Sequence, residues 1–257
     1  MNAQRAGWGL SIVVVLGLIA WGLAYLASPG KHLLSGAPAA DGSFEHTEEG
    51  EFYHISIKVP QKTPLWRLFS AEADMKARYA MERVFLEAVE QFKTESGVEE
   101  VNLEDEPWME GRRYEYAASY AEFVSPGFAS YRYDIYVDTG GAHPNGYYRT
   151  FVFDREGNEV ELSALFAPGT PYLEAIAKEA HAQVEEELSV RLGSEAISTL
   201  FAEGLEPRAE NFQNFVVDQD TLRFFLPPYQ VAPYAAGPFE VDIPFSEFGD
   251  ILASNVP

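Results

Sequence analysis

The segment from Asp138 to Tyr148 constrains the fold more than any other part of the chain, because it joins two alternating runs through a loop of glycine and proline. Residues 131–137 alternate before this loop and residues 148–153 alternate after it, which is typical of two paired β-strands. Three glycines of the segment allow positive φ and favour a shaped turn over a slack linker: Gly140, Gly141 and Gly146.

The remaining runs predict an α+β fold, with an antiparallel sheet and two long helices packed on it. Apolar residues recur at helical spacing in residues 70–94 and 171–192. Ser70 is an N-cap for the first helix, and Gly97 ends it. Further strands are expected at residues 51–59, 112–121, 160–162, 214–217, 221–226 and 239–243, and shorter helices at 194–201 and 246–252.

Trp8 to Ala27 is a run of 20 residues without a charge. A helix of this length spans roughly 30 Å, the thickness of the hydrocarbon core of a bilayer. Arg5 precedes the run, so the short N-terminus is expected in the cytoplasm and the body outside it. A cleaved signal peptide that ends near Ala27 is the alternative to this retained anchor.

The sequence therefore divides into an anchor, a tether and an extracytoplasmic body. Residues 28–50 are rich in proline, glycine and alanine, which favours a tether. The expected parts are a cytoplasmic N-terminus at 1–7, a transmembrane anchor at 8–27, a linker at 28–50, and a body in two parts at 51–110 and 111–257.

The body is strongly acidic. Residues 36–257 hold 16 basic and 40 acidic residues, a net charge of −24. This charge repels nucleic acid and attracts cationic partners, although solubility alone is an alternative reason for it. The chain has no cysteine, which excludes disulfides and thiol catalysis.

Among the five histidines, only His143 lies in the central loop. As a catalytic base it would be oriented by Asp138 or Asp134, whereas as a structural residue it would hydrogen-bond the backbone of its own loop. No nucleophile elbow, HExxH helix, EF-hand or phosphate-binding glycine loop occurs in the sequence. We expect no metal, no cofactor and no enzyme activity, with a hydrolase centred on His143 as the alternative.

Tyrosine is concentrated in the region of the predicted hairpin. These side chains either pack beneath the long helices or face outward as binding anchors, since tyrosine offers a large contact area at a small entropy cost. The tyrosines are Tyr114, Tyr116, Tyr120, Tyr131, Tyr133, Tyr136, Tyr147 and Tyr148.

Two separated stretches resemble a known domain. One runs from Asp138 to Asn145 and continues with residues 151–154 and Gly157; the other covers Leu222 to Gly237 and continues with residues 239–245. Together they are similar to the extracellular domain of RsiV-type anti-sigma factors, which also stands beside the deacetylase domain of PdaC-type proteins. The resemblance covers most of residues 44–252.

This resemblance implies a membrane-anchored binding or sensing module of the bacterial envelope. In the RsiV branch the domain binds lysozyme, a strongly basic protein, so lysozyme or a cell-wall glycan is the expected partner. We expect no sigma-binding domain, because about seven residues precede the apolar run, and no deacetylase domain before Pro257. The expected contact residues are His143, Pro144, Asn145, Tyr147 and Tyr148, followed by Tyr229 and Tyr234.

Overall fold

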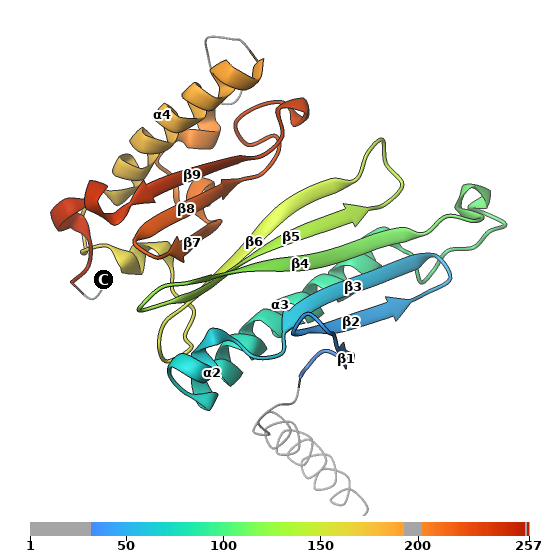
Figure 1. Cartoon of the computed structure of the whole chain (residues 1–257). Helices are drawn as coiled ribbons and strands as arrows, with labels where there is room; N and C mark the ends of the chain where they lie inside the picture. Colours follow the sequence, from blue (N-terminus) through green and yellow to red (C-terminus); the bar gives the residue numbers. More distant parts are fainter. Residues whose placement is uncertain (1–31, 193–201, 255, 257) are drawn as a thin grey trace, which may run out of the picture.

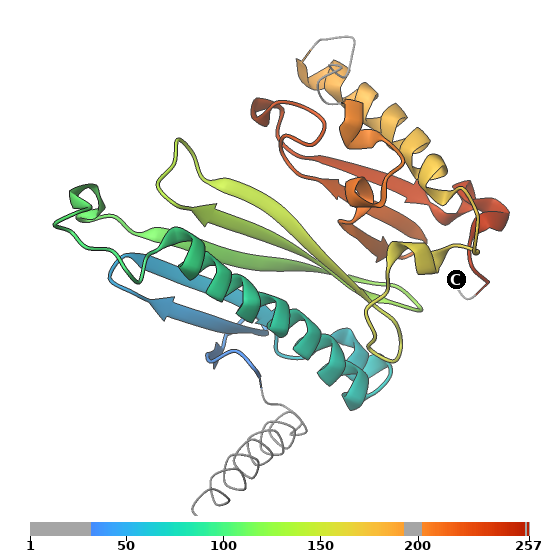
Figure 2. The ribbon, with the colours of Figure 1, turned by 180° about the vertical axis from the view of Figure 1, so that it is seen from behind.

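The computed structural model describes residues 32–192, 202–254 and 256 as two packed units, each a sheet covered by one long helix (Figures 1 and 2). The larger sheet has the order β1-β2-β3-β4-β5-β6. Its strands are β1 (Ala37–Pro38), β2 (Ser43–Glu49), β3 (Tyr53–Pro60), β4 (Tyr114–Val124), β5 (Ala129–Asp138) and β6 (Asn145–Phe153). The smaller sheet contains β7 (Phe215–Asp218), β8 (Thr221–Leu226) and β9 (Phe239–Pro244).

The prediction of α+β architecture is confirmed, but the single antiparallel sheet is wrong. The larger sheet is mixed, because β3 and β4 run parallel while its other neighbouring strands are antiparallel. The chain between β3 and β4 passes through the first long helix, and such a crossover returns the chain in the same direction. Each long helix also covers its own sheet, so the two helices do not share one.

The prediction of a tether at residues 28–50 is wrong for its second half. β2 pairs with β3 along its whole length, and Phe44 and His46 are buried on the helix side of the sheet. The His46 imidazole stands where alternation would place an apolar residue, and its Nδ1 lies 2.6 Å from the carbonyl oxygen of Ser35. This polar residue in a buried position hides the strand pattern in the sequence.

Helix α3 (Ala71–Ser96) follows the short helix α2 (Pro64–Leu68) and covers one face of the larger sheet (Figure 2). The Ser70 hydroxyl accepts a hydrogen bond from the Ala73 amide at 3.0 Å, and Gly97 closes the helix with φ +65°. Both predicted caps are confirmed. Apolar residues of α3 pack on alternate residues of β3 to β6: Ala77, Met81, Phe85, Val89 and Phe92.

The buried face of α3 also carries a row of charges one turn apart. Asp74, Arg78 and Glu82 are all nearly inaccessible to solvent. The Arg78 guanidinium lies 3.1 Å from Asp74 and 3.7 Å from Glu82. Glu82 also binds the His32 ring at 2.6 Å and accepts hydrogen bonds from the Leu33 and Leu34 amides. The charged row thus fastens the first described residues to the helix.

Helix α4 (Tyr172–Leu192) packs on the smaller sheet and forms the second core with it. The predicted hairpin at 214–226 and the last strand are confirmed, whereas residues 160–162 form no full strand and lead into a 3₁₀ turn. The final predicted helix is two 3₁₀ turns, and residues 194–201 lie outside the described residues. The 3₁₀ turns are Pro107–Met109, Leu162–Leu165, Ala202–Leu205, Ala209–Phe212, Tyr234–Ala236, Phe245–Glu247 and Gly249–Ile251.

The two units meet where β7 lies against the face of the larger sheet opposite α3. The Ser130 hydroxyl accepts from the Val217 amide at 3.2 Å and lies 3.3 Å from its carbonyl oxygen. The Thr150 hydroxyl accepts from the Phe215 amide at 3.0 Å. Side chains of β5 and β6 therefore satisfy backbone groups of β7 that have no neighbouring strand on that side.

Across the described ranges, no helix is both long and apolar enough to cross a membrane. The proposed anchor, Trp8 to Ala27, lies outside those ranges.

Candidate functional site

The central loop connects β5 to β6 and is shaped by its first residues. The Asp138 carboxylate accepts a hydrogen bond from the Gly140 amide at 2.9 Å, and Gly140 has φ +72°. Of the three glycines of this segment that allow positive φ, only Gly140 adopts it. Gly141 lies outside the left-handed region, and Gly146 belongs to β6, opposite Tyr136.

The second expected segment is a loop between β8 and β9 that begins with a tight turn. The Gln230 amide donates to the Pro227 carbonyl at 3.1 Å, and Tyr229 at the third position of the turn has φ +72°. A bulky residue seldom adopts this conformation, which glycine or asparagine normally supplies. The Gln230 side chain fixes the turn by donating to the carbonyls of Gly204 and Asn211 at 2.9 Å.

His143 joins the two loops. Its Nδ1 lies 2.9 Å from the Pro144 carbonyl oxygen, so this nitrogen carries the proton and donates it. Its Nε2 then accepts from the Tyr229 hydroxyl at 3.2 Å. The imidazole also stacks on Tyr234, with ring centroids 4.5 Å apart. The predicted bond of His143 to its own loop is confirmed, and the structure unites residues that are 86 and 91 positions apart in the sequence.

We call four exposed rings at this junction the aromatic patch: His143, Tyr229 and Tyr234, which contact one another, and the neighbouring Tyr136. Tyr229 and Tyr234 are 53% and 41% exposed, although both rings are large and apolar. Their centroids lie 5.4 Å apart, so they form a continuous surface with the imidazole. Exposed aromatic rings in contact with one another are typical of binding surfaces.

Two carboxylates lie beside the aromatic patch. Glu115 and Asp138 are directly opposite each other on β4 and β5, on the face away from α3. Like charges in this arrangement repel each other, and a cation placed between them would relieve the repulsion. Partial desolvation and these two carboxylates raise the pKa of the neighbouring Tyr136. The surface around the patch therefore favours positive charge.

The same face of the sheet has a shallow hollow of about 290 Å³ next to Tyr136. Small side chains from three strands form its floor: Ser56, Ala117, Ser119 and Gly146. A partner can therefore approach the sheet closely at this point.

The other expected contact residues divide between the two faces. Tyr148 packs against Phe225 with ring centroids 5.7 Å apart and lies under the Arg132 guanidinium. Asn145 and Tyr147 face the opposite side of β6, toward α3. Of the eight hairpin tyrosines, Tyr116, Tyr131 and Tyr133 are buried and Tyr136 and Tyr147 are exposed, so both expectations hold in part.

The predicted orientation of His143 by an aspartate is wrong. The Asp138 carboxylate binds the Gly140 amide, and Asp134 pairs with Arg132 at 3.1 Å. Tyr136 is one of the eight tyrosines considered as outward-facing anchors but is not among the expected contact residues, and the sequence does not predict the pairing of Glu115 with Asp138. Alternation in residues 114–121 and 131–137 places Glu115 and Tyr136 opposite the buried tyrosines of their own strands, whereas Asp138, which the sequence assigns to the loop, is the last residue of β5.

Comparison with known proteins found a family model that matches part of the chain. A family model described as "Protein of unknown function (DUF3298)" matches residues 163–246, which include α4 and the smaller sheet. The match includes Tyr229 and Tyr234 but not His143. The aromatic patch therefore lies at the junction of the matched segment and the larger sheet.

Several curated proteins are similar in sequence. The immunogenic protein MPT64 of Mycobacterium tuberculosis is 31% identical over 139 residues, which cover 53% of this chain and 58% of that protein. An esterase of the same organism is 30% identical over 113 residues, 44% of this chain and 47% of that protein. The peptidoglycan-N-acetylmuramic acid deacetylase PdaC of Bacillus subtilis is 24% identical over 98% of this chain and 52% of its own length. The chain thus spans about half the length of these relatives.

Two solved structures share the fold. A DUF3298 family member from Bacteroides fragilis has a TM-score of 0.59 at 18% identity, covering 83% of this chain and 93% of that one. A Pseudomonas aeruginosa member has a TM-score of 0.54 at 16% identity with the same coverage. The comparisons support the PdaC side of the resemblance, while the RsiV side stays a prediction.

Proposed function

We propose that this protein is a binding module of the bacterial cell envelope that holds a cationic protein on its aromatic patch. The observation that carries the proposal is the meeting of His143, Tyr229 and Tyr234 beside two adjacent carboxylates, Glu115 and Asp138. The rings supply desolvated anchor contacts, and Glu115 and Asp138 supply charge complementarity. A net charge of −24 on residues 36–257 adds long-range attraction for a basic partner.

Location in the envelope is part of the same proposal. The 20-residue uncharged run at Trp8 to Ala27 would anchor the body outside the cytoplasm. The similarity to PdaC, whose name gives peptidoglycan as its substrate, supports an envelope setting. Lysozyme is the first partner to test because it is basic and acts in that compartment, and a cell-wall glycan is the second.

The conformation of Tyr229 supports a binding role for its ring. Positive φ costs a bulky residue roughly 1–2 kcal/mol, yet the side chain it presents is more than half exposed. Packing within the protein does not explain an exposed ring in a strained backbone. Strain of this kind is typical of positions retained for contact with a ligand.

The test is calorimetry of the full-length chain with lysozyme, below and above physiological salt. Tyr229→Ala is expected to weaken binding by at least ~2 kcal/mol, since a central aromatic anchor is lost. Glu115→Gln is expected to weaken binding mainly at low salt, because charge attraction is screened when the Debye length falls below ~8 Å. Trp108→Ala and Glu90→Gln are matched controls, since both residues are exposed and lie away from the patch.

Absence of binding at either salt concentration would exclude lysozyme. Binding that disappears at high salt and does not respond to Tyr229→Ala would reduce the interaction to attraction by an acidic surface. Binding to insoluble peptidoglycan with the same dependence on Tyr229 would assign the patch to a glycan instead.

A hydrolase centred on His143 is the second candidate, and similarity to the mycobacterial esterase is the observation in its favour. Because Nδ1 donates to Pro144, Nε2 would be the basic nitrogen, and the hydroxyl that faces it belongs to Tyr229. Turnover of p-nitrophenyl acetate that is abolished by both His143→Ala and Tyr229→Phe would support this candidate. Absence of turnover above the buffer rate would count against it.

A further inference from the structure

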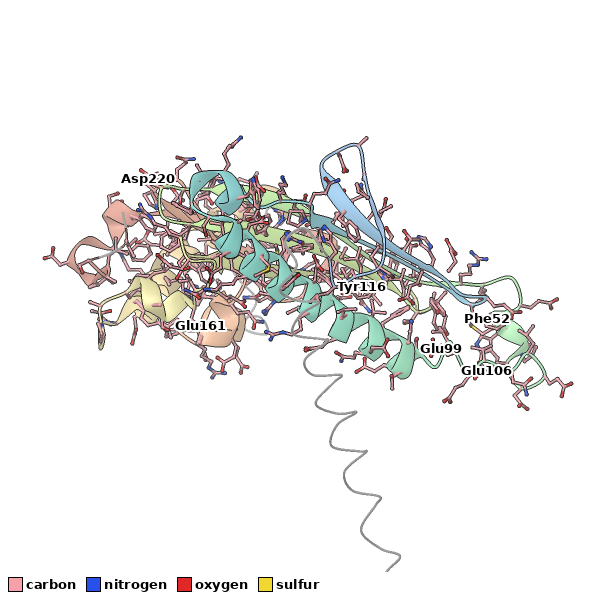
Figure 3. All side chains as sticks on the ribbon, turned by 90° about the horizontal axis from the view of Figure 1, so that it is seen from below. Phe52, Glu99, Glu106, Tyr116, Glu161 and Asp220 are labelled. Atoms are coloured by element: carbon pink, nitrogen blue, oxygen red, sulfur yellow. The ribbon has the colours of Figure 1, made fainter. Side chains whose placement is uncertain are left out.

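A second concave site lies on the α3 side of the larger sheet, away from the aromatic patch. It is a cleft of about 630 Å³ between the C-terminal half of α3 and the adjoining ends of β4, β5 and β6. Tyr116, labelled in Figure 3, marks its inner end beside α3. The volume lies within the range of small-molecule binding sites.

Aromatic rings form the floor and walls of this cleft. Phe92 and Tyr116 are buried at its base, with ring centroids 5.7 Å apart. Tyr114 and Tyr147 stand nearer the opening, and Tyr147 is 42% exposed. The Tyr147 ring is therefore partly exposed in the cleft, above the buried rings of Phe92 and Tyr116.

The rim of the cleft carries short polar side chains: Gln91, Glu95, Ser96, Thr139 and Asn145. The Gln91 amide donates to the Glu95 carboxylate at 2.7 Å, which fixes both groups on the same side of the opening. The Tyr147 hydroxyl is protonated at neutral pH, as an ordinary phenol is, and it can both donate and accept hydrogen bonds. The rim thus offers both hydrogen-bond donors and acceptors beside an aromatic surface.

The charges of the cleft exclude one class of ligand. None of the described residues that line it is basic, and Glu95 is its single acidic group. An anionic ligand would meet a carboxylate with no compensating cation. An uncharged or amino-bearing ligand with many hydroxyls, and with C–H faces that pack on aromatic rings, fits both the walls and the rim.

We propose that this cleft binds one or two pyranose units of a neutral or amino saccharide, with Tyr147 as the stacking platform and Gln91, Glu95 and Asn145 as the hydroxyl partners. The site is separate from the aromatic patch, although the central loop contributes to both. Thr139 faces the cleft, whereas His143 faces Tyr234. The inference thus goes beyond the proposed function, and it holds whether or not lysozyme binds.

The experiment is calorimetry of the full-length chain in a detergent without a sugar headgroup, because maltoside detergents would compete for the cleft. The probes are a trimer of N-acetylglucosamine, a trimer of glucose, and choline. We expect at least one saccharide to bind, and Tyr147→Ala to weaken that binding about tenfold, which corresponds to about 1.4 kcal/mol. Tyr147→Phe should retain most of the affinity, since the ring is kept.

Three control variants separate this site from the rest of the molecule. Trp108→Ala removes an exposed ring outside the cleft, and Tyr229→Ala removes a ring of the aromatic patch; both should leave saccharide binding unchanged. Circular dichroism of each variant verifies that it is folded. Leu86→Ala, which removes an exposed side chain of α3 outside the cleft, controls for changes in the helix.

Three results would overturn the inference. They are no saccharide binding by the unmutated chain at millimolar probe, equal affinity of folded Tyr147→Ala, and weakening by Trp108→Ala as large as that by Tyr147→Ala. Choline binding that depends on Tyr147 without any saccharide binding would also overturn it, since the cleft would then be an aromatic cage for cations.

Discussion

At the scale of single residues, backbone conformation distinguishes groups that look equivalent in the sequence. Gly140 and Gly141 are neighbours, yet only Gly140 has positive φ, and a Cβ built on it would lie 3.1 Å from the Tyr114 ring. Tyr229 has the same positive φ without being glycine. Positive φ at Gly140 is a requirement of the turn, whereas at Tyr229 it presents a ring to solvent at a conformational cost.

Gly140→Ala is expected to reduce the free energy of unfolding by about 1–2 kcal/mol, because it adds a side chain to a left-handed residue. Gly141→Ala is the matched control, since the nearest atom to its added Cβ is 3.8 Å away. Its effect should stay within about 0.5 kcal/mol. Urea denaturation of both variants measures the difference, and equal losses would show that the turn does not depend on Gly140.

At the scale of elements, α3 carries two kinds of ion pair on opposite faces. Arg78 lies between Asp74 and Glu82 with all three side chains buried. The Lys76–Glu72 pair has the same spacing but is 45% and 74% exposed. The buried row fixes the direction in which the chain enters the domain, because Glu82 binds the backbone of residues 33 and 34.

Arg78→Met should destabilise the fold by about 3–5 kcal/mol, because it removes the guanidinium that lies between two buried carboxylates. Lys76→Met, on the exposed face of the same helix, should change stability by less than about 1 kcal/mol. Thermal melting of the two variants at neutral pH makes the comparison. Equal, small effects of Arg78→Met and Lys76→Met would contradict a stabilising role for the buried row.

At the scale of the whole molecule, stability rests on two cores joined through β7. The core between α3 and the larger sheet contains tyrosines that no solvent reaches, among them Tyr131 and Tyr133. Burial raises the pKa of both phenols well above the ordinary value of 10.0. Burial also raises the pKa of the neighbouring Tyr120 to about 12.

These shifts predict cooperative unfolding in alkali. Because the folded-state pKa values are raised, their contribution to stability is complete below pH 10 and is lost as pH rises through about 12. Tyrosinate absorbance and circular dichroism should therefore change together in that window. Tyr120→Phe removes one of the ionising groups and should move the transition to higher pH. Ionisation of the buried tyrosines below pH 10 in a folded protein would contradict this account.

Local chemistry alone determined much of the fold. Ser70 and Gly97 delimit α3 in the sequence because caps depend on adjacent backbone groups. The hairpin of β7 and β8, the last strand and the turn at Gly140 followed from short-range patterns for the same reason. His143, Tyr229 and Tyr234 could also be predicted as contact residues from the sequence, but their contacts with one another could not.

Only the tertiary structure decided the rest. The division into two sheets and the parallel pairing of β3 with β4 depend on where a long crossover returns, which no local pattern encodes. The contact of His143 with Tyr229 and Tyr234 joins two loops of different sheets. The cleft around Tyr147 exists because α3 and three strand ends leave a space between them. Such sites arise from packing between distant elements, and the sequence specifies them only through the complete fold.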